Sequence, residues 1–161
     1  MDTFTYKLHT LFKQLRRTQT VVGFAESCTG GKLSAKVTEN PGVSDIFMGS
    51  VVCYANSAKE DILGVLRESI EKEGAVSETV ALQMAKGAQK VLRTNWAAAI
   101  TGIAGPDGGT KTKPVGTVCF GIVGPGVEYT EKKLFTGSRV QIQEQSAEQA
   151  VELLNKHLER I

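Results

Sequence analysis

The chain has 161 residues, a length that fits one domain with its own hydrophobic core. Hydrophobic residues make up 41% of the sequence and charged residues 22%, as in ordinary globular proteins. The net charge of +2 is too small to argue for nucleic acid as a partner. No apolar run is long enough to cross a membrane, so we expect no membrane partner. We expect a single domain over residues 1–161.

The cysteines and the N-terminal residues indicate the cellular compartment that we expect for the protein. Three cysteines, Cys28, Cys53 and Cys119, are odd in number, widely spaced and without a CxxC pair. They predict neither a disulfide framework nor a zinc site. Residues 1–10 carry charged side chains where the apolar core of a signal peptide would lie. These features favour a cytoplasmic protein.

Helices and strands alternate along most of the sequence and end in a hairpin. In chain order, the predicted elements are a helix over 4–15, a strand over 21–25, a helix over 32–39, a strand over 50–54, a helix over 56–63, a helix capped by Ser77, a strand over 96–101, hairpin strands over 115–123 and 127–135, and a helix over 140–158. This order predicts a three-layer α/β/α sandwich with a mixed, mostly parallel sheet and a C-terminal antiparallel hairpin. Ligand-binding loops are expected beyond the carboxyl ends of the parallel strands.

The first segment that could carry chemistry, ESCTGG, follows the first predicted strand and opens a helix at residues 26–31. Its glycines let a ligand approach the backbone, and N–H groups at a helix start favour an anion or a developing oxyanion. A hydroxyl at this turn is well placed to attack a carbonyl. The alternative is that Ser27 or Thr29 only caps the helix.

The second segment, YANSAK, runs from Tyr54 to Lys59 across a strand-to-helix junction, so both end residues can face the strand-end crevice. A nucleophilic serine needs a base, and the only histidines, His9 and His157, fall in predicted terminal helices. If Ser27 is a nucleophile, a lysine is the remaining base, and burial would make its neutral form accessible. The alternative is a solvated lysine paired with a neighbouring acidic residue.

The third segment, TGIAGPDGG, occupies residues 101–109 after another predicted strand. A loop this rich in glycine can present backbone N–H groups to a phosphate or a carbonyl oxygen. The alternative is a flexible connector, although Ile103 and Ala104 argue for an ordered loop packed on the domain.

Cys28 competes with Ser27 for the role of nucleophile, because a thiolate at a helix N-terminus can be reactive. Neighbouring residues on a turn point in different directions, so we expect only one of the two to face the ligand. A buried and inert cysteine is the more common outcome.

Four segments in order resemble the CinA C-terminal domain family. They are AESCTGG at 25–31, VVCYANSAKEDILGV at 51–65, GAVSE at 74–78, and TGIAGPDGG at 101–109 followed by KPVGTV at 113–118. Stand-alone members of this family are nicotinamide-nucleotide amidases. The resemblance implies an α/β/α fold and hydrolysis of nicotinamide mononucleotide to nicotinate mononucleotide and ammonia, in pyridine nucleotide salvage. It implies no metal and no cofactor.

The same resemblance implies roles for individual residues. Ser27 would be the nucleophile, Lys59 its base and Tyr54 an assisting residue, while Arg139 in FTGSR would hold the phosphate. The other residues expected to bind substrate are Glu26, Thr29, Gly30, Gly31, Thr101, Gly102, Ala104 and Gly105.

One position departs from the pattern, because Gln143 stands where members often carry a second arginine. A second cationic contact is therefore missing at this point.

A different class of function also stays open: the same loops could hold a nucleotide for sensing, or dock a partner, without turnover. Another small amide could replace the mononucleotide as substrate. The oligomeric state is open too, although the apolar helices could support a homodimer.

Overall fold

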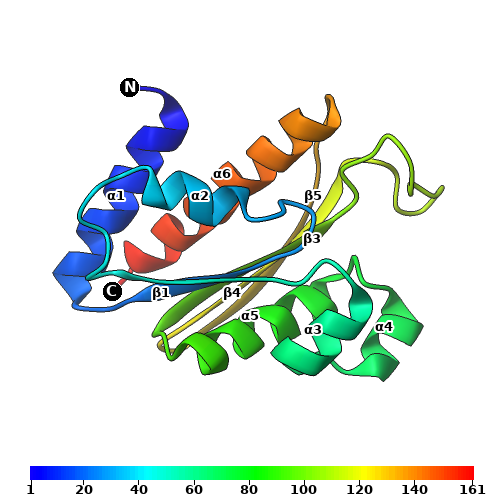
Figure 1. The fold of residues 1–161 in the computed structure, drawn as a ribbon, viewed down its shortest axis with the longest axis horizontal. Helices are drawn as coiled ribbons and strands as arrows, with labels where there is room; N and C mark the ends of the chain where they lie inside the picture. Colours follow the sequence, from blue (N-terminus) through cyan, green and yellow to red (C-terminus); the bar gives the residue numbers. More distant parts are fainter.

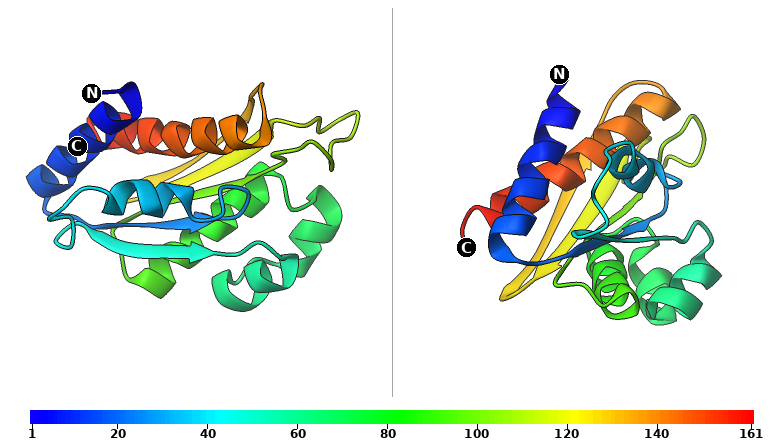
Figure 2. Two further views of the ribbon diagram at one scale, coloured as in Figure 1. Left: turned by 45° about the horizontal axis from the view of Figure 1, so that its top comes forward. Right: turned by 60° about the vertical axis from the view of Figure 1, so that its left-hand side comes forward.

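The structure is a computed structural model that describes all 161 residues. Its elements are α1 (Thr3–Thr18), β1 (Val22–Glu26), α2 (Lys32–Thr38), β2 (Phe47–Val52), α3 (Asn56–Leu63), α4 (Arg67–Glu73), α5 (Glu78–Leu92), β3 (Trp96–Gly102), β4 (Thr117–Gly124), β5 (Val127–Leu134) and α6 (Arg139–Leu158). Helices α1, α2 and α6 cover one face of the sheet, and α3, α4 and α5 cover the other (Figures 1 and 2).

The five strands form one sheet in the order β2-β1-β3-β4-β5. Strand β1 pairs in parallel with both β2 and β3, whereas β4 is antiparallel to β3 and to β5. Four strands thus run in one direction and β4 runs in the other. The predicted α/β/α sandwich, with its mixed sheet and closing hairpin, is confirmed.

The structure also departs from the expected elements in two places. Strand β2 begins at Phe47 rather than at residue 50, and it carries a register irregularity opposite β1, with Gly49 at φ 145°. Helix α4 was not expected from the sequence, because RESIEKE is short, mostly charged and without a side-chain cap. The predicted cap at Ser77 is confirmed, since its side chain accepts from the Val80 N–H.

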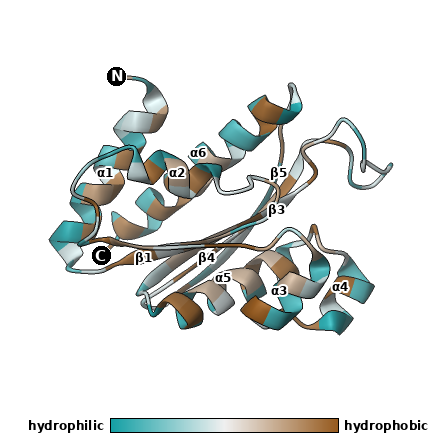
Figure 3. Cartoon of the chain, viewed as in Figure 1, coloured by the Kyte–Doolittle hydropathy of each residue, from teal (hydrophilic) through white to brown (hydrophobic).

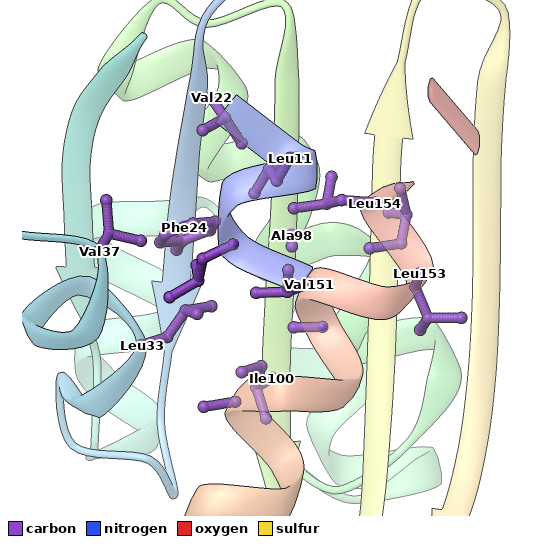
Figure 4. Packing of buried hydrophobic residues seen from close by; sticks show 14 of the residues in the cluster. Leu11, Val22, Phe24, Leu33, Val37, Ala98, Ile100, Val151, Leu153 and Leu154 are labelled. Carbon is purple, nitrogen blue, oxygen red and sulfur yellow. The ribbon is translucent and has the colours of Figure 1, made fainter. Parts of the chain in front are cut away.

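The two faces of the sheet differ in side-chain size. The face under α1, α2 and α6 holds large residues such as Phe24, Ile100 and Phe120, which join one cluster with Leu11 and Leu154 (Figure 4). Burying each large side chain of this kind contributes about 1.5–3 kcal/mol. Helices α1 and α6 accordingly carry both hydrophobic and hydrophilic stretches (Figure 3).

Small residues on the opposite face allow α5 to lie close to the sheet. Ala25, Ala97 and Ala99 belong to this second cluster. A Cβ on Gly121 of β4 would lie only 2.4 Å from the carbonyl oxygen of Ala81 in α5. Glycine is therefore required here by backbone packing.

The parallel pairing aligns the carboxyl ends of three strands. Glu26 at the end of β1 lies opposite Val52 of β2 and Ile100 of β3. The residues that follow each strand therefore meet at one edge of the sheet, as in other open α/β folds. The glycine-rich loop after β3 extends beyond the sheet on this side, near the start of α6 (Figures 1 and 2).

Candidate active site

A pocket of about 240 Å³ lies at this edge of the sheet. The turn after β1, the segment from Tyr54 into α3, the loop before α5, the glycine-rich loop and the first residue of α6 all contribute to its lining. Ser27, Lys59 and Tyr54 all line it, together with Thr101, Gly102, Ala104, Gly105 and Arg139. The structure therefore gathers eight of the residues expected at the site from four separate segments.

Ser27 occupies the turn between β1 and α2 and is largely buried. Its N–H donates to the Ile100 carbonyl oxygen at 3.1 Å, and its own carbonyl accepts from the Gly30 N–H at 3.1 Å. These bonds extend the β1–β3 ladder by one residue and hold the turn. The backbone thus fixes the position of Ser27 in the lining of the pocket.

Glu26, just before the serine, is completely buried and stabilises this turn. One carboxylate oxygen accepts from Thr29 Oγ1 at 2.8 Å and the Leu33 N–H at 3.0 Å. The other accepts from the Ser34 N–H at 3.1 Å and Ser50 Oγ at 2.8 Å. The carboxylate thereby satisfies the N-terminal N–H groups of α2, where negative charge is favourable.

Lys59 is the buried cation of the site, with only 2% of its surface exposed. Its Nζ donates to the carbonyl oxygens of Cys53, at 3.1 Å, and Tyr54, at 3.0 Å, and it forms no ion pair. Its acidic neighbour Glu60 pairs instead with Arg67. Burial lowers the pKa of Lys59 below the ordinary lysine value.

The two carbonyl acceptors are compatible with a neutral amine. An uncharged lysine has two N–H groups, which the two carbonyls occupy, and one lone pair that can accept a proton. The structure contains no hydrogen bond between Lys59 Nζ and Ser27 Oγ, so proton transfer requires the lone pair to turn toward the serine. Hydrogen bonds of this kind often tighten only when substrate is bound.

Cys28 is a poor candidate for the nucleophile. Its side chain is buried in the core cluster on the α6 side of the sheet. Burial raises the pKa of its thiol to about 12, so the thiolate is scarce at neutral pH. Cys28 lines the pocket as Ser27 does and is similarly buried, so it is the raised pKa of the thiol that favours Ser27.

Arg139, the first residue of α6, joins two of the site loops. Its guanidinium donates to the Gly105 carbonyl oxygen and to the Tyr54 hydroxyl, the latter at 3.3 Å. One helical turn later, Gln143 Nε2 donates to the Cys28 carbonyl oxygen at 2.9 Å. The first two turns of α6 therefore hold three loops of the site together. The sequence did not indicate this role for Gln143.

Four residues expected to bind substrate lie outside the pocket lining: Glu26, Thr29, Gly30 and Gly31. Thr29 is fully buried against Glu26, and the Gly30 N–H is occupied by Ser27. Their expected contact with a ligand finds no support in the geometry. By contrast, Ala104 and Gly105 line the pocket, and their N–H groups donate no hydrogen bond within the protein.

The pocket also contains residues that the sequence analysis did not assign to it, among them Asn56, Ala75, Val76, Ile103 and Asp107. Ile103 is adjacent to two assigned residues in the chain, and Asn56 and Asp107 each lie two residues from one. Ala75 and Val76 come from the GAVSE segment, which belongs to the resemblance but was assigned no role at the site. Only the fold brings that segment to the serine.

We found no second candidate for a catalytic site elsewhere in the molecule. A larger groove of about 1010 Å³ between α1, α2 and α6 contains none of the candidate catalytic residues. No three histidine, cysteine, aspartate or glutamate side chains lie together as a metal site would require. No helix is both long and apolar enough to cross a membrane.

The fold and the pocket define an α/β domain that places a serine and a buried lysine at the ends of parallel strands. Residues 6–158 match the model of the CinA C-terminal domain. A CinA-like protein from Fervidobacterium nodosum is 44% identical over 146 residues, which are 91% of this chain and 36% of that protein. One from Trichormus variabilis is 50% identical over 147 residues, 89% of this chain and 35% of that protein.

Solved structures of CinA superfamily proteins have the same fold as this chain. A CinA superfamily protein from Klebsiella pneumoniae superposes with a TM-score of 0.94 at 29% identity, covering 99% of this chain and 100% of that one. The competence/damage inducible protein CihA from Agrobacterium tumefaciens gives a TM-score of 0.94 at 35% identity, covering 99% and 97%. The chain belongs to the CinA C-terminal domain family. It spans about a third of the length of the two CinA-like relatives.

Proposed function

We propose that the chain hydrolyses the carboxamide of nicotinamide mononucleotide to nicotinate mononucleotide and ammonia, in pyridine nucleotide salvage. The observation that carries the proposal is the state of Lys59. It is a buried lysine with a lowered pKa and two carbonyl acceptors, and it shares one pocket with Ser27 and Arg139. This combination supplies a base, a nucleophile and a cation for a phosphate.

The first half of the reaction forms an acyl-enzyme. The neutral amine of Lys59 takes the proton of Ser27 Oγ as this oxygen attacks the carboxamide carbon. The tetrahedral intermediate carries an oxyanion, and the free N–H groups of Ala104 and Gly105 are its proposed donors. In other hydrolases, one such donor lowers the activation free energy by about 3 kcal/mol. The ammonium of Lys59 then protonates the leaving nitrogen, and ammonia departs.

The second half releases the acid. Lys59 is neutral again after ammonia has left, so it can take a proton from a water molecule that attacks the ester carbon. Collapse of the second tetrahedral intermediate breaks the bond to Ser27 Oγ, which recovers its proton from Lys59. Nicotinate mononucleotide leaves, and the enzyme returns to its starting state.

Arg139 is the proposed partner of the 5′-phosphate. A guanidinium has five N–H donors, and the bonds to Gly105 and Tyr54 use two of them. The remaining donors can bind a phosphate, for which the planar group is well suited. In the same arrangement Tyr54 stays attached to the cation and can assist at the entrance of the pocket.

The proposal is tested with nicotinamide mononucleotide, the purified protein and a chelator. We expect ammonia and nicotinate mononucleotide to form in equal amounts. Nicotinamide riboside, which lacks the phosphate, should give a kcat/KM at least tenfold lower. If neither product forms while the mononucleotide still raises the melting temperature, the chain is a nucleotide-binding module and the proposed hydrolysis is wrong.

A further inference from the structure

The segment that joins α4 to α5 is held by side chains rather than by regular secondary structure. Three successive carbonyl groups, those of Glu73, Gly74 and Ala75, each accept a hydrogen bond from a different side chain. The donors are Lys113 Nζ, Ser77 Oγ at 2.9 Å and Thr101 Oγ1 at 2.9 Å, in that order. A connection restrained at three consecutive residues is rigid compared with ordinary loops.

Two of these bonds tie the segment to the glycine-rich loop. Thr101 stands where that loop leaves β3, and Lys113 lies on its returning limb. The Lys113 ammonium passes close to Gly74, where a Cβ would lie 2.9 Å from Nζ. The absence of a side chain at Gly74 therefore leaves room for the lysine to reach the Glu73 carbonyl. The two loops are positioned as one unit.

This unit contributes four apolar residues to the lining of the pocket. Ala75 and Val76 line it from one loop, and Ile103 and Ala104 line it from the other. We call these four residues the apolar wall. The rest of the lining includes the polar side chains of Ser27, Lys59 and Arg139. The pocket thus combines a reactive polar part with a fixed hydrocarbon surface.

The wall has a consequence for the choice of substrate. A small polar amide gains no free energy from hydrocarbon, whereas a flat ring next to the carboxamide buries apolar surface against it. A rigid wall also avoids the cost of ordering a loop when the ring binds.

We propose that Val76 and the rest of the apolar wall are the part of the pocket that contacts the ring of the proposed substrate, and that Lys113 is a positioning residue that holds this wall in place. The inference rests on the proposed function and adds the part of the substrate that is recognised and the residues that recognise it. Lys113 acts through the Glu73 carbonyl and does not line the pocket.

The first test changes the wall without changing its shape. Val76→Thr replaces one methyl group by a hydroxyl, and Val91→Thr, at a half-exposed position of α5, is the matched control. Calorimetry measures the Kd of nicotinate mononucleotide, which has the ring and the phosphate, and of ribose 5-phosphate, which has no ring. We expect Val76→Thr to raise the first Kd about tenfold and to leave the second within twofold of wild type. The control should change neither.

The second test removes the donor to Glu73. Lys113→Met keeps the aliphatic stem, Lys113→Arg restores a donor, and Lys111→Met is a control on the same loop at an exposed position. We expect Lys113→Met to raise the Kd of nicotinate mononucleotide about fivefold with that of ribose 5-phosphate unchanged. Lys113→Arg should recover most of the loss. A role limited to general stability would weaken both ligands together.

The outcomes separate this inference from the proposed function, because both ligands are measured by binding alone. A ring-specific loss in Val76→Thr and Lys113→Met supports the wall even if wild type releases no ammonia. Equal losses for both ligands, or no loss for either, overturn the inference even if wild type is an active amidase.

Discussion

The buried carboxylate of Glu26 gives a sharp test of how the nucleophile turn is built. In Glu26→Gln the side chain keeps its shape, but one acceptor oxygen becomes an NH₂ donor. The amide oxygen can still serve the Thr29 hydroxyl and the Leu33 N–H, which share one oxygen in wild type. In place of the second carboxylate oxygen, the new NH₂ group faces the Ser34 N–H and the Ser50 hydroxyl, which that oxygen accepts from in wild type.

The structure gives the size of the effect. The Ser50 hydroxyl can rotate and accept, but the Ser34 N–H is left without a partner, which costs about 1–3 kcal/mol. Loss of the negative charge at the start of α2 adds about 1 kcal/mol. The free energy of unfolding should therefore fall by about 3 kcal/mol. For a chain of this length that corresponds to a melting temperature lower by about 6–12 °C.

Urea unfolding followed by circular dichroism measures this change, with Glu39→Gln at the other end of α2 as the control. Glu39 is exposed and pairs with Lys36 at 3.5 Å, so its loss should change stability by less than about 1 kcal/mol. A loss below about 1 kcal/mol in Glu26→Gln would refute the reasoning. A higher KM at unchanged stability would restore Glu26 as a substrate-binding residue.

The site and the sheet lead to four further predictions. Because only neutral Lys59 can act as base, kcat/KM should rise with pH until the lowered pKa of this residue is passed; a profile that is flat from pH 6 to 10 would exclude it. Since the unfolded chain binds the Lys59 proton more tightly, the unfolding free energy of wild type should rise relative to Lys59→Met as pH increases from 7 toward 10, as measured by urea titrations. Cys28→Ala should keep kcat/KM within a few-fold of wild type, because a thiol with a pKa of about 12 is protonated; a hundredfold loss would make Cys28 the nucleophile. Gly121→Ala should lower the unfolding free energy by about 2 kcal/mol, because the new methyl group meets the Ala81 carbonyl, and unchanged stability would contradict the close packing of α5.

Periodicity and turn residues were sufficient to predict most of the fold. Alternating helices and strands, the Ser77 cap and the hairpin around residues 124–126 all indicate local structure directly. Helix α4 was not predicted from the sequence because its seven residues have neither a clear apolar stripe nor a side-chain cap. The start of β2 was misplaced because Gly49 separates Phe47 and Met48 from the β-branched residues Val51 and Val52, and only pairing with β1 identifies Phe47 as part of the strand.

The site was less accessible to sequence reasoning, because it depends on contacts between distant residues. The lack of a suitable histidine pointed to Lys59, and the resemblance identified Ser27 and Arg139. The sequence could not indicate that Glu26 faces α2 instead of a ligand, since this depends on Ser50, 24 residues away. The contact of Gln143 with the Cys28 carbonyl spans 115 residues and carries no local signal.

The central claim is hydrolysis of the carboxamide through Ser27. Its most direct test measures ammonia and nicotinate mononucleotide released from nicotinamide mononucleotide by wild type and by Ser27→Ala, at equal concentrations and with a chelator present. The account predicts equal amounts of both products from wild type and none above background from Ser27→Ala. Undiminished release by a correctly folded Ser27→Ala variant would contradict it.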